Sequence, residues 1–155
     1  MTLRLMSCVM FCVVFGCGAV AQEWESGESN RGAWAVIQDG KFRLDVSCWP
    51  NESTFFFNLS GGPFEGMKNI DDGNDSMMLW MEQPDGRLAR HPIDGHYFGP
   101  DRTFVGRFLT SDIVLDQFRN GTQLWLTGAG GVEIVRFPMT GTGKVRGHFQ
   151  ESCGL

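Results

Sequence analysis

The chain has 155 residues, of which 42% are hydrophobic and 20% are charged, and its formal net charge is −5. This length and composition are typical of one globular domain and exclude a disordered chain. The acidic balance argues against a nucleic-acid or anionic-membrane ligand, because such ligands are held by clustered Lys and Arg.

The first residues have the pattern of an export signal. A short positive start ends at Arg4, residues 5–16 are apolar, and Ala19 and Ala21 form a small-x-small cleavage site. No stretch reaches the roughly 18–20 apolar residues of a membrane span. We therefore predict a signal peptide over residues 1–21, a periplasmic or secreted product and no membrane span.

A second processing route is open at Cys17. The preceding residues, Val-Phe-Gly, loosely fit a bacterial lipoprotein box, which would leave Cys17 as a lipidated N-terminus. Phe15 is unusual in such a box. Cleavage after Ala21 is therefore favoured over a lipid anchor.

Two cysteines, Cys48 and Cys153, remain beyond this leader. In an oxidising compartment two cysteines are most simply joined by one disulfide. On the chain-entropy model, a bridge that closes a loop of about a hundred residues is worth about 4–5 kcal/mol. The alternative is a pair of buried free thiols.

Residues 22–32 are polar and rich in Gly, Ser and Glu, so they predict a flexible lead-in to a single β-rich domain over residues 33–155. A short apolar strand is predicted over residues 33–38. Asp39 and Gly40 then predict a hairpin turn.

Residues 41–48 alternate strictly between apolar and polar side chains, which is the clearest strand pattern in the chain. The pattern places Cys48 on the core-facing side of the strand, where a disulfide is protected. Further strands are predicted over residues 53–59, 77–82, 87–93 and 103–109. Turns are predicted at residues 84–86 and at Asp94 and Gly95, and a loop over residues 61–76.

The last third predicts two short helices, over residues 111–119 and 143–152. Between them, two strands over 123–127 and 132–137 are joined by a glycine-rich hairpin. The predicted fold is mainly β: an antiparallel sandwich or a barrel-like sheet, with two short C-terminal helices and one disulfide.

One segment has residues suited to metal chemistry. His91, Asp94 and His96 supply two imidazoles and a carboxylate, which are ligands for zinc or iron, and His148 would join them only if the fold brought it there. Because Asp94 precedes Gly95, exposed turn residues are the preferred interpretation. A small metal-dependent hydrolase using these side chains is the alternative function.

Other motifs fail on spacing. The oxygen-rich residues 71–76 would place Lys68 at the first ligand position of a calcium loop. Residues 141–144 lack the earlier glycine and the following Ser or Thr of a phosphate loop. No Gly-x-Ser-x-Gly motif is present. We therefore predict no catalytic residue, no cofactor and no enzyme activity.

Aromatic residues are the remaining candidates. Phe55, Phe56 and Phe57 are consecutive, so they cannot all face one side of a strand. Core packing is the preferred interpretation, and an exposed patch of Phe55, Phe56, Phe57 and Trp80 is the candidate partner surface. A pocket for a small apolar ligand, lined by the same side chains, is a further alternative.

The order of features over residues 34–153 carries a resemblance. Trp34 precedes the alternating strand that ends in cysteine, and a later helix has Phe-x-x-Gly spacing at Phe118. The chain closes on a strand, a glycine turn, a short helix and a cysteine. This order resembles periplasmic accessory proteins of type VI secretion and secreted domains of the invasion-associated-locus-B type. Some of those domains have a second internal cysteine pair, which this chain lacks.

The resemblance implies an envelope or secreted interaction protein, and it maps no catalytic residue onto this chain. We therefore predict an exported, non-enzymatic protein-binding module of the bacterial envelope. Its partner is expected to be another envelope or secreted protein.

Overall fold

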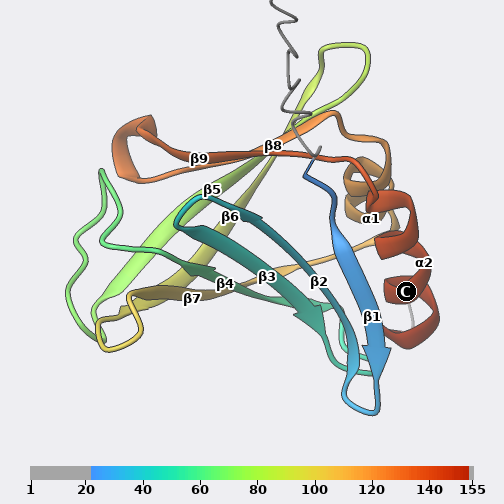
Figure 1. Cartoon of the computed structure of the whole chain (residues 1–155), viewed down its shortest axis with the longest axis horizontal. Coiled ribbons are helices and arrows are strands. Elements are labelled where there is room, and N and C mark those ends of the chain that lie inside the picture. The colour runs from blue at the N-terminus through green and yellow to red at the C-terminus, as the bar shows by residue number, and fades with distance from the viewer. Residues whose placement is uncertain (1–21, 154–155) are drawn as a thin grey trace, which may run out of the picture.

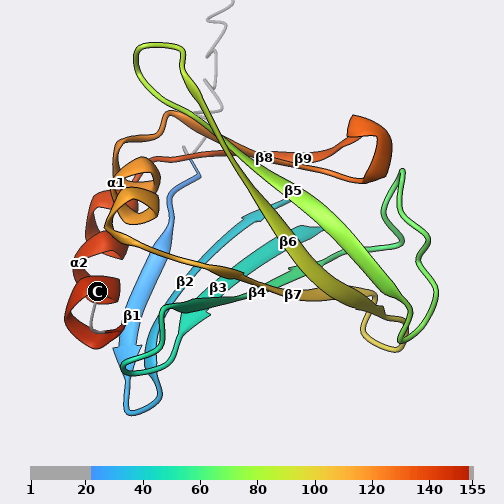
Figure 2. The same cartoon turned by 180° about the vertical axis from the view of Figure 1, so that it is seen from behind.

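Nine strands lie within residues 22–153, the part of the chain that the computed structural model describes, and all join one antiparallel sheet. Their order is β1-β2-β3-β4-β7-β6-β5-β8-β9. The sheet curls into a half-barrel (Figures 1 and 2). The strands are β1 (Glu25–Ser29), β2 (Gly32–Asp39), β3 (Phe42–Cys48), β4 (Thr54–Ser60), β5 (Asn74–Glu82), β6 (Leu88–Phe98), β7 (Thr103–Leu109), β8 (Gln123–Thr127) and β9 (Glu133–Pro138).

The alternation of side chains decides which face of the sheet is buried. Along β3, Leu44, Val46 and Cys48 are buried while the residues between them are not. Opposite them on β4, Phe55, Phe57 and Leu59 are buried on the same inner face. The inner face therefore forms the core, and the predicted barrel-like antiparallel sheet is confirmed.

Two helices cover the inner face at one end of the half-barrel (Figure 1). Helix α1 (Asp112–Asn120) is capped at its N-terminus by Ser111, whose side chain accepts a hydrogen bond from the Val114 backbone N–H. Helix α2 (Thr142–Cys153) brings the ring of Phe149 to 4.8 Å from that of Phe55. A short 3-10 turn, η1 (Ala129–Gly131), joins β8 to β9. Both predicted C-terminal helices are confirmed.

A disulfide joins Cys48, the last residue of β3, to Cys153, the last residue of α2. Both cysteines are buried, and 105 positions separate them along the chain. The bridge thus ties the C-terminal helix to the third strand. It confirms the predicted pairing.

The expected flexible lead-in over residues 22–32 is wrong, because residues 25–29 form strand β1 against β2. The physical reason is Trp24, which is only 3% exposed. Its indole N–H donates to the Pro138 carbonyl at 3.0 Å, and its backbone N–H donates to the Thr140 carbonyl at 3.0 Å. One buried side chain therefore anchors a segment whose composition is that of a flexible tail.

The turn predicted at Asp94 and Gly95 is also wrong. Strand β6 runs straight through both residues, and the chain reverses later, where the Arg102 backbone N–H donates to the Gly99 carbonyl. Gly95 is required by packing rather than by a turn, because a Cβ there would lie 2.1 Å from the Val105 carbonyl oxygen on β7. The glycine permits a close approach of two strands.

The predicted signal peptide, with Cys17, lies outside the described residues. Within residues 22–153, neither helix is long and apolar enough to cross a bilayer.

Candidate functional site

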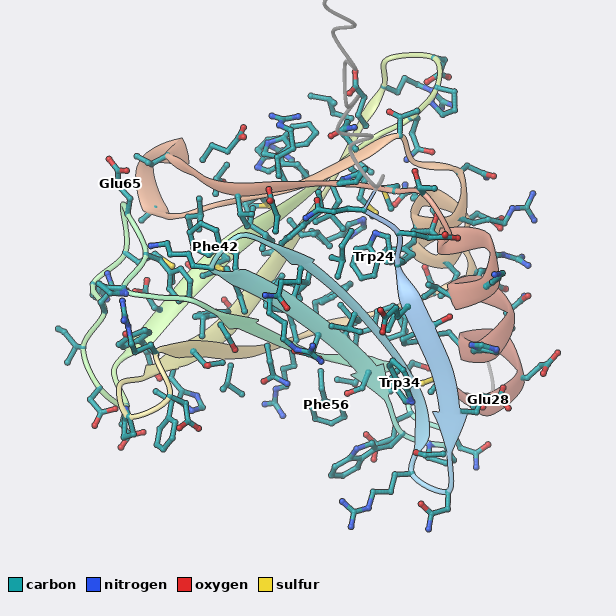
Figure 3. All side chains as sticks on the ribbon, in the orientation of Figure 1. Trp24, Glu28, Trp34, Phe42, Phe56 and Glu65 are labelled. Atoms are coloured by element: carbon teal, nitrogen blue, oxygen red, sulfur yellow. A yellow bond between two sulfur atoms is a disulfide. The ribbon has the colours of Figure 1, made fainter. Side chains whose placement is uncertain are left out.

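The three consecutive phenylalanines divide between the two faces of β4. Phe55 and Phe57 are 3% and 1% exposed and belong to the core, so their inclusion in an exposed partner surface is wrong. Phe56 lies on the outer face and projects away from the sheet (Figure 3). Trp80 also lies on the outer face, with its ring stacked 6.0 Å from that of Trp125.

Phe56 has a neighbour that the predicted partner surface did not include. The ring of Trp49 lies 4.8 Å from that of Phe56, and Trp49 is 51% exposed. Trp49 directly follows Cys48, so the disulfide fixes the strand end from which it emerges. We call Trp49 and Phe56 the Phe56 patch. Its sequence signal was a large aromatic residue just past the end of a core-facing strand.

An open groove of about 620 Å³ lies beside Phe56 on the outer face of the sheet. It crosses β7, β6 and β5. Its lining residues are Phe56, Asn74, Asp75, Asp94, Gly95, His96, Val105, Gly106 and Arg107. Side chains of both charge signs and an imidazole thus lie next to the half-buried ring of Phe56.

A second hollow, of about 550 Å³, opens between β6 and β7. The two strands pair from Phe98 and Thr103 as far as Asp94 and Arg107, and then they diverge (Figure 2). Pro92 follows on β6 and has no N–H with which to continue a ladder. We call this hollow the cleft. Its lining residues are Thr54, His91, Pro92, Asp94, Arg107, Phe108 and Leu109.

The groove and the cleft share two charged residues. Arg107 and Asp94 lie directly opposite each other on β7 and β6, and both line both hollows. Neither takes part in the four ion pairs found within the described residues. Arg107 was not selected from the sequence, where it is one polar position of an alternating strand.

The predicted histidine cluster is only partly brought together. His91 lines the cleft, where its ring stacks on Phe108 with centroids 6.1 Å apart and its Nε2 lies 2.9 Å from Gln117 Oε1. His96 lines the groove instead. His148 is on α2, and its buried Nδ1 has no hydrogen-bond partner in the described part of the chain.

Strand geometry separates the two histidines of this segment. His91 and His96 are five residues apart on one continuous strand, so their side chains point to opposite faces. No group of three or more His, Cys, Asp or Glu side chains within residues 22–153 is placed to hold a metal ion. The geometry therefore gives the metal-dependent hydrolase no support.

Replacement of His91 or His96 by alanine is expected to leave zinc affinity unchanged, because the two imidazoles cannot reach one ion from opposite faces. The measurement is zinc content after purification, followed by titration of each variant with Zn²⁺ against a chromogenic chelator. Stoichiometric zinc in the wild type that is lost in both variants would contradict this prediction and restore the hydrolase.

The Phe56 patch thus lies beside two adjoining hollows, the groove on the outer face and the cleft that opens to it. No protein-family model, curated protein or solved structure matches the chain.

Proposed function

We propose that the chain is an exported, non-enzymatic protein-binding module of the bacterial envelope, acting in the periplasm or as a secreted protein. Its partner is another envelope or secreted protein. The module binds this partner through the Phe56 patch and the groove beside it.

The observation that carries the proposal is the contact between the exposed ring of Trp49 and the half-buried ring of Phe56 on the outer face of the sheet. Tryptophan and arginine are among the side chains most enriched in the residues that dominate protein interfaces. Arg107 lies directly opposite Phe56 on β7, so an arginine adjoins the Phe56 patch. The backbone next to Trp49 is tethered, because the preceding residue, Cys48, is disulfide-bonded.

Three further features support an extracytoplasmic location. Disulfides persist in oxidising compartments. The pattern over residues 1–21 is that of an export signal. The order of features that resembles type VI secretion accessory proteins and invasion-associated-locus-B domains has the same implication.

Replacement of both Trp49 and Phe56 by alanine is expected to weaken partner binding at least about tenfold, because anchors of this type each contribute more than about 1 kcal/mol. The partner is first enriched from envelope extract on the immobilised wild-type protein and is then purified. Its dissociation constant is measured by calorimetry with the wild type and with the double variant.

The matched control is Ile113→Ala, which removes an apolar side chain that is 69% exposed on α1, outside the patch. Its affinity should equal that of the wild type. Equal affinity of the double variant and the wild type for the purified partner would refute the proposed binding surface. Failure of every envelope protein to bind at micromolar concentration would refute the proposed function.

A further inference from the structure

The cleft between β6 and β7 differs from a surface depression because the sheet itself is open there. Past the pair formed by Asp94 and Arg107, β7 continues against β4, where Leu109 pairs with Thr54. Strand β6 continues against β5, where His91 pairs with Leu79. Past this pair, β7 remains hydrogen-bonded to β4 and β6 to β5, but β6 and β7 no longer pair with each other. The opening therefore results from the course of the two strands.

The inner wall of the cleft is apolar and fixed. Phe108 is almost fully buried, and the His91 ring stacks on it with an interplanar angle of 28°. The hydrogen-bonding contact between His91 Nε2 and Gln117 Oε1 holds that ring against helix α1. Pro92 and the exposed Leu109 complete the apolar part of the lining.

The rim of the cleft carries one charge of each sign. Side chains directly opposite on antiparallel strands have Cβ atoms about 5 Å apart. Arg107 and Asp94 hold this relation, yet they form no ion pair with each other or with another described residue. A ligand with a single charge would be attracted by one of these two side chains and repelled by the other. A ligand with a neighbouring carboxylate and ammonium matches both.

We propose that the cleft binds a free α-amino acid with an apolar side chain. The ligand carboxylate pairs with the Arg107 guanidinium, the ligand ammonium pairs with the Asp94 carboxylate, and the ligand side chain lies against Phe108. The volume of about 550 Å³ is in the range of small-molecule sites. This ligand site goes beyond the proposed function: it shares Asp94 and Arg107 with the groove but uses neither Trp49 nor Phe56.

The test uses three probes with the same side chain: L-leucine, N-acetyl-L-leucine, which lacks the ammonium charge, and L-leucinamide, which lacks the carboxylate. Binding to the full exported protein is followed by NMR titration of the backbone amides of residues 91–94 and 107–109. L-Leucine should bind saturably, and each single-charge probe should bind about tenfold more weakly, the scale of one charged hydrogen-bonding contact.

Two variants that each remove one charge assign the two contacts. Arg107→Gln should bind L-leucine and L-leucinamide with equal affinity, because the carboxylate no longer has its partner. Asp94→Asn should bind L-leucine and N-acetyl-L-leucine equally, because the ammonium no longer has its partner. Arg90→Gln is the matched control: Arg90 is an exposed arginine on β6 outside the cleft lining, and its loss should change none of the three affinities.

The inference is overturned if L-leucine gives no saturable shift, or if all three probes bind the wild type equally. It is also overturned if a peptide with capped termini and adjacent Lys and Glu side chains binds where L-leucine does not. A partner protein that depends on the Phe56 patch would still support the proposed function after such a result. Conversely, amino-acid binding would stand if no partner were found.

Discussion

Replacement of both Cys48 and Cys153 by alanine is expected to lower the free energy of unfolding by about 4–5 kcal/mol, the value for release of a loop of about a hundred residues. The loop closed by the bridge spans 105 positions and includes most of the sheet. Without the bridge, the unfolded chain gains the conformational freedom that the bridge removes. A loss of this size is a large fraction of the stability of a domain of this length.

The measurement is equilibrium unfolding in urea for the non-reduced wild type and for the double variant. Free energies in water should be compared rather than midpoints, since removing a cross-link expands the unfolded state and changes the slope. Wild type held in dithiothreitol is the control and should match the variant. An unchanged free energy, or labelling of both cysteines by a thiol reagent in the native non-reduced protein, would contradict the bridged fold.

Replacement of Phe57 by alanine is expected to lower the free energy of unfolding by about 3–5 kcal/mol, whereas replacement of Phe56 should cost only about 0.5–1.5 kcal/mol. Phe57 is fully buried on the inner face, and its ring lies 6.5 Å from that of Phe104. Its removal leaves a cavity in the core. Phe56 on the outer face loses its stack with Trp49 but leaves no cavity.

These two adjacent residues form a matched pair, with the same chemistry, strand and substitution. The comparison again uses urea unfolding of each single variant. Equal losses, or a larger loss for Phe56→Ala, would mean that the faces of β4 are assigned the wrong way round. That result would also remove the contact between Trp49 and Phe56 on which the proposed function rests.

The alternating pattern of residues 41–48 was sufficient to identify β3 and its buried face. Alternation is a local property, since successive side chains of any strand point to opposite faces. It therefore placed Cys48 in the core, and the presence of only one other cysteine beyond the leader linked it to Cys153. The capping Ser111 predicted α1 for a similarly local reason.

Strand β1 and the middle of β6 could not be predicted in this way. Residues 25–29 have the composition of a flexible segment but form a strand because the preceding residue, Trp24, is anchored. Its ring packs against Phe118, and its indole N–H donates a hydrogen bond to the Pro138 carbonyl. Asp94 and Gly95 have the composition of a turn. They remain in a strand because both pair with β5 on one side and β7 on the other, and β7 passes too close to Gly95 for any side chain. In both cases a contact distant in sequence overrides local preference.

In the candidate site, too, some residues were predicted from the sequence while their contacts were decided by the tertiary structure. His91, Asp94 and Phe56 were recognisable from their residue types, but their partners were not. Arg107 lies opposite Asp94 only once β7 pairs with β6. The ring contact of Trp49 with Phe56 and the hydrogen-bonding contact of Gln117 with His91 likewise form only in the assembled fold. His91 and His96 lie on opposite faces because β6 is continuous between them. The predicted turn at Asp94 and Gly95 had interrupted that strand.

The sequence by itself determined the β-rich class, most strand positions, both helices and the disulfide, because each depends on local periodicity, capping or the number of cysteines. The tertiary structure alone decided the strand order, the inclusion of β1, the divergence of β6 from β7 and the placing of Trp49 on Phe56. Periodicity specifies which face of a strand is buried, but the neighbour across that strand is chosen by packing between distant segments.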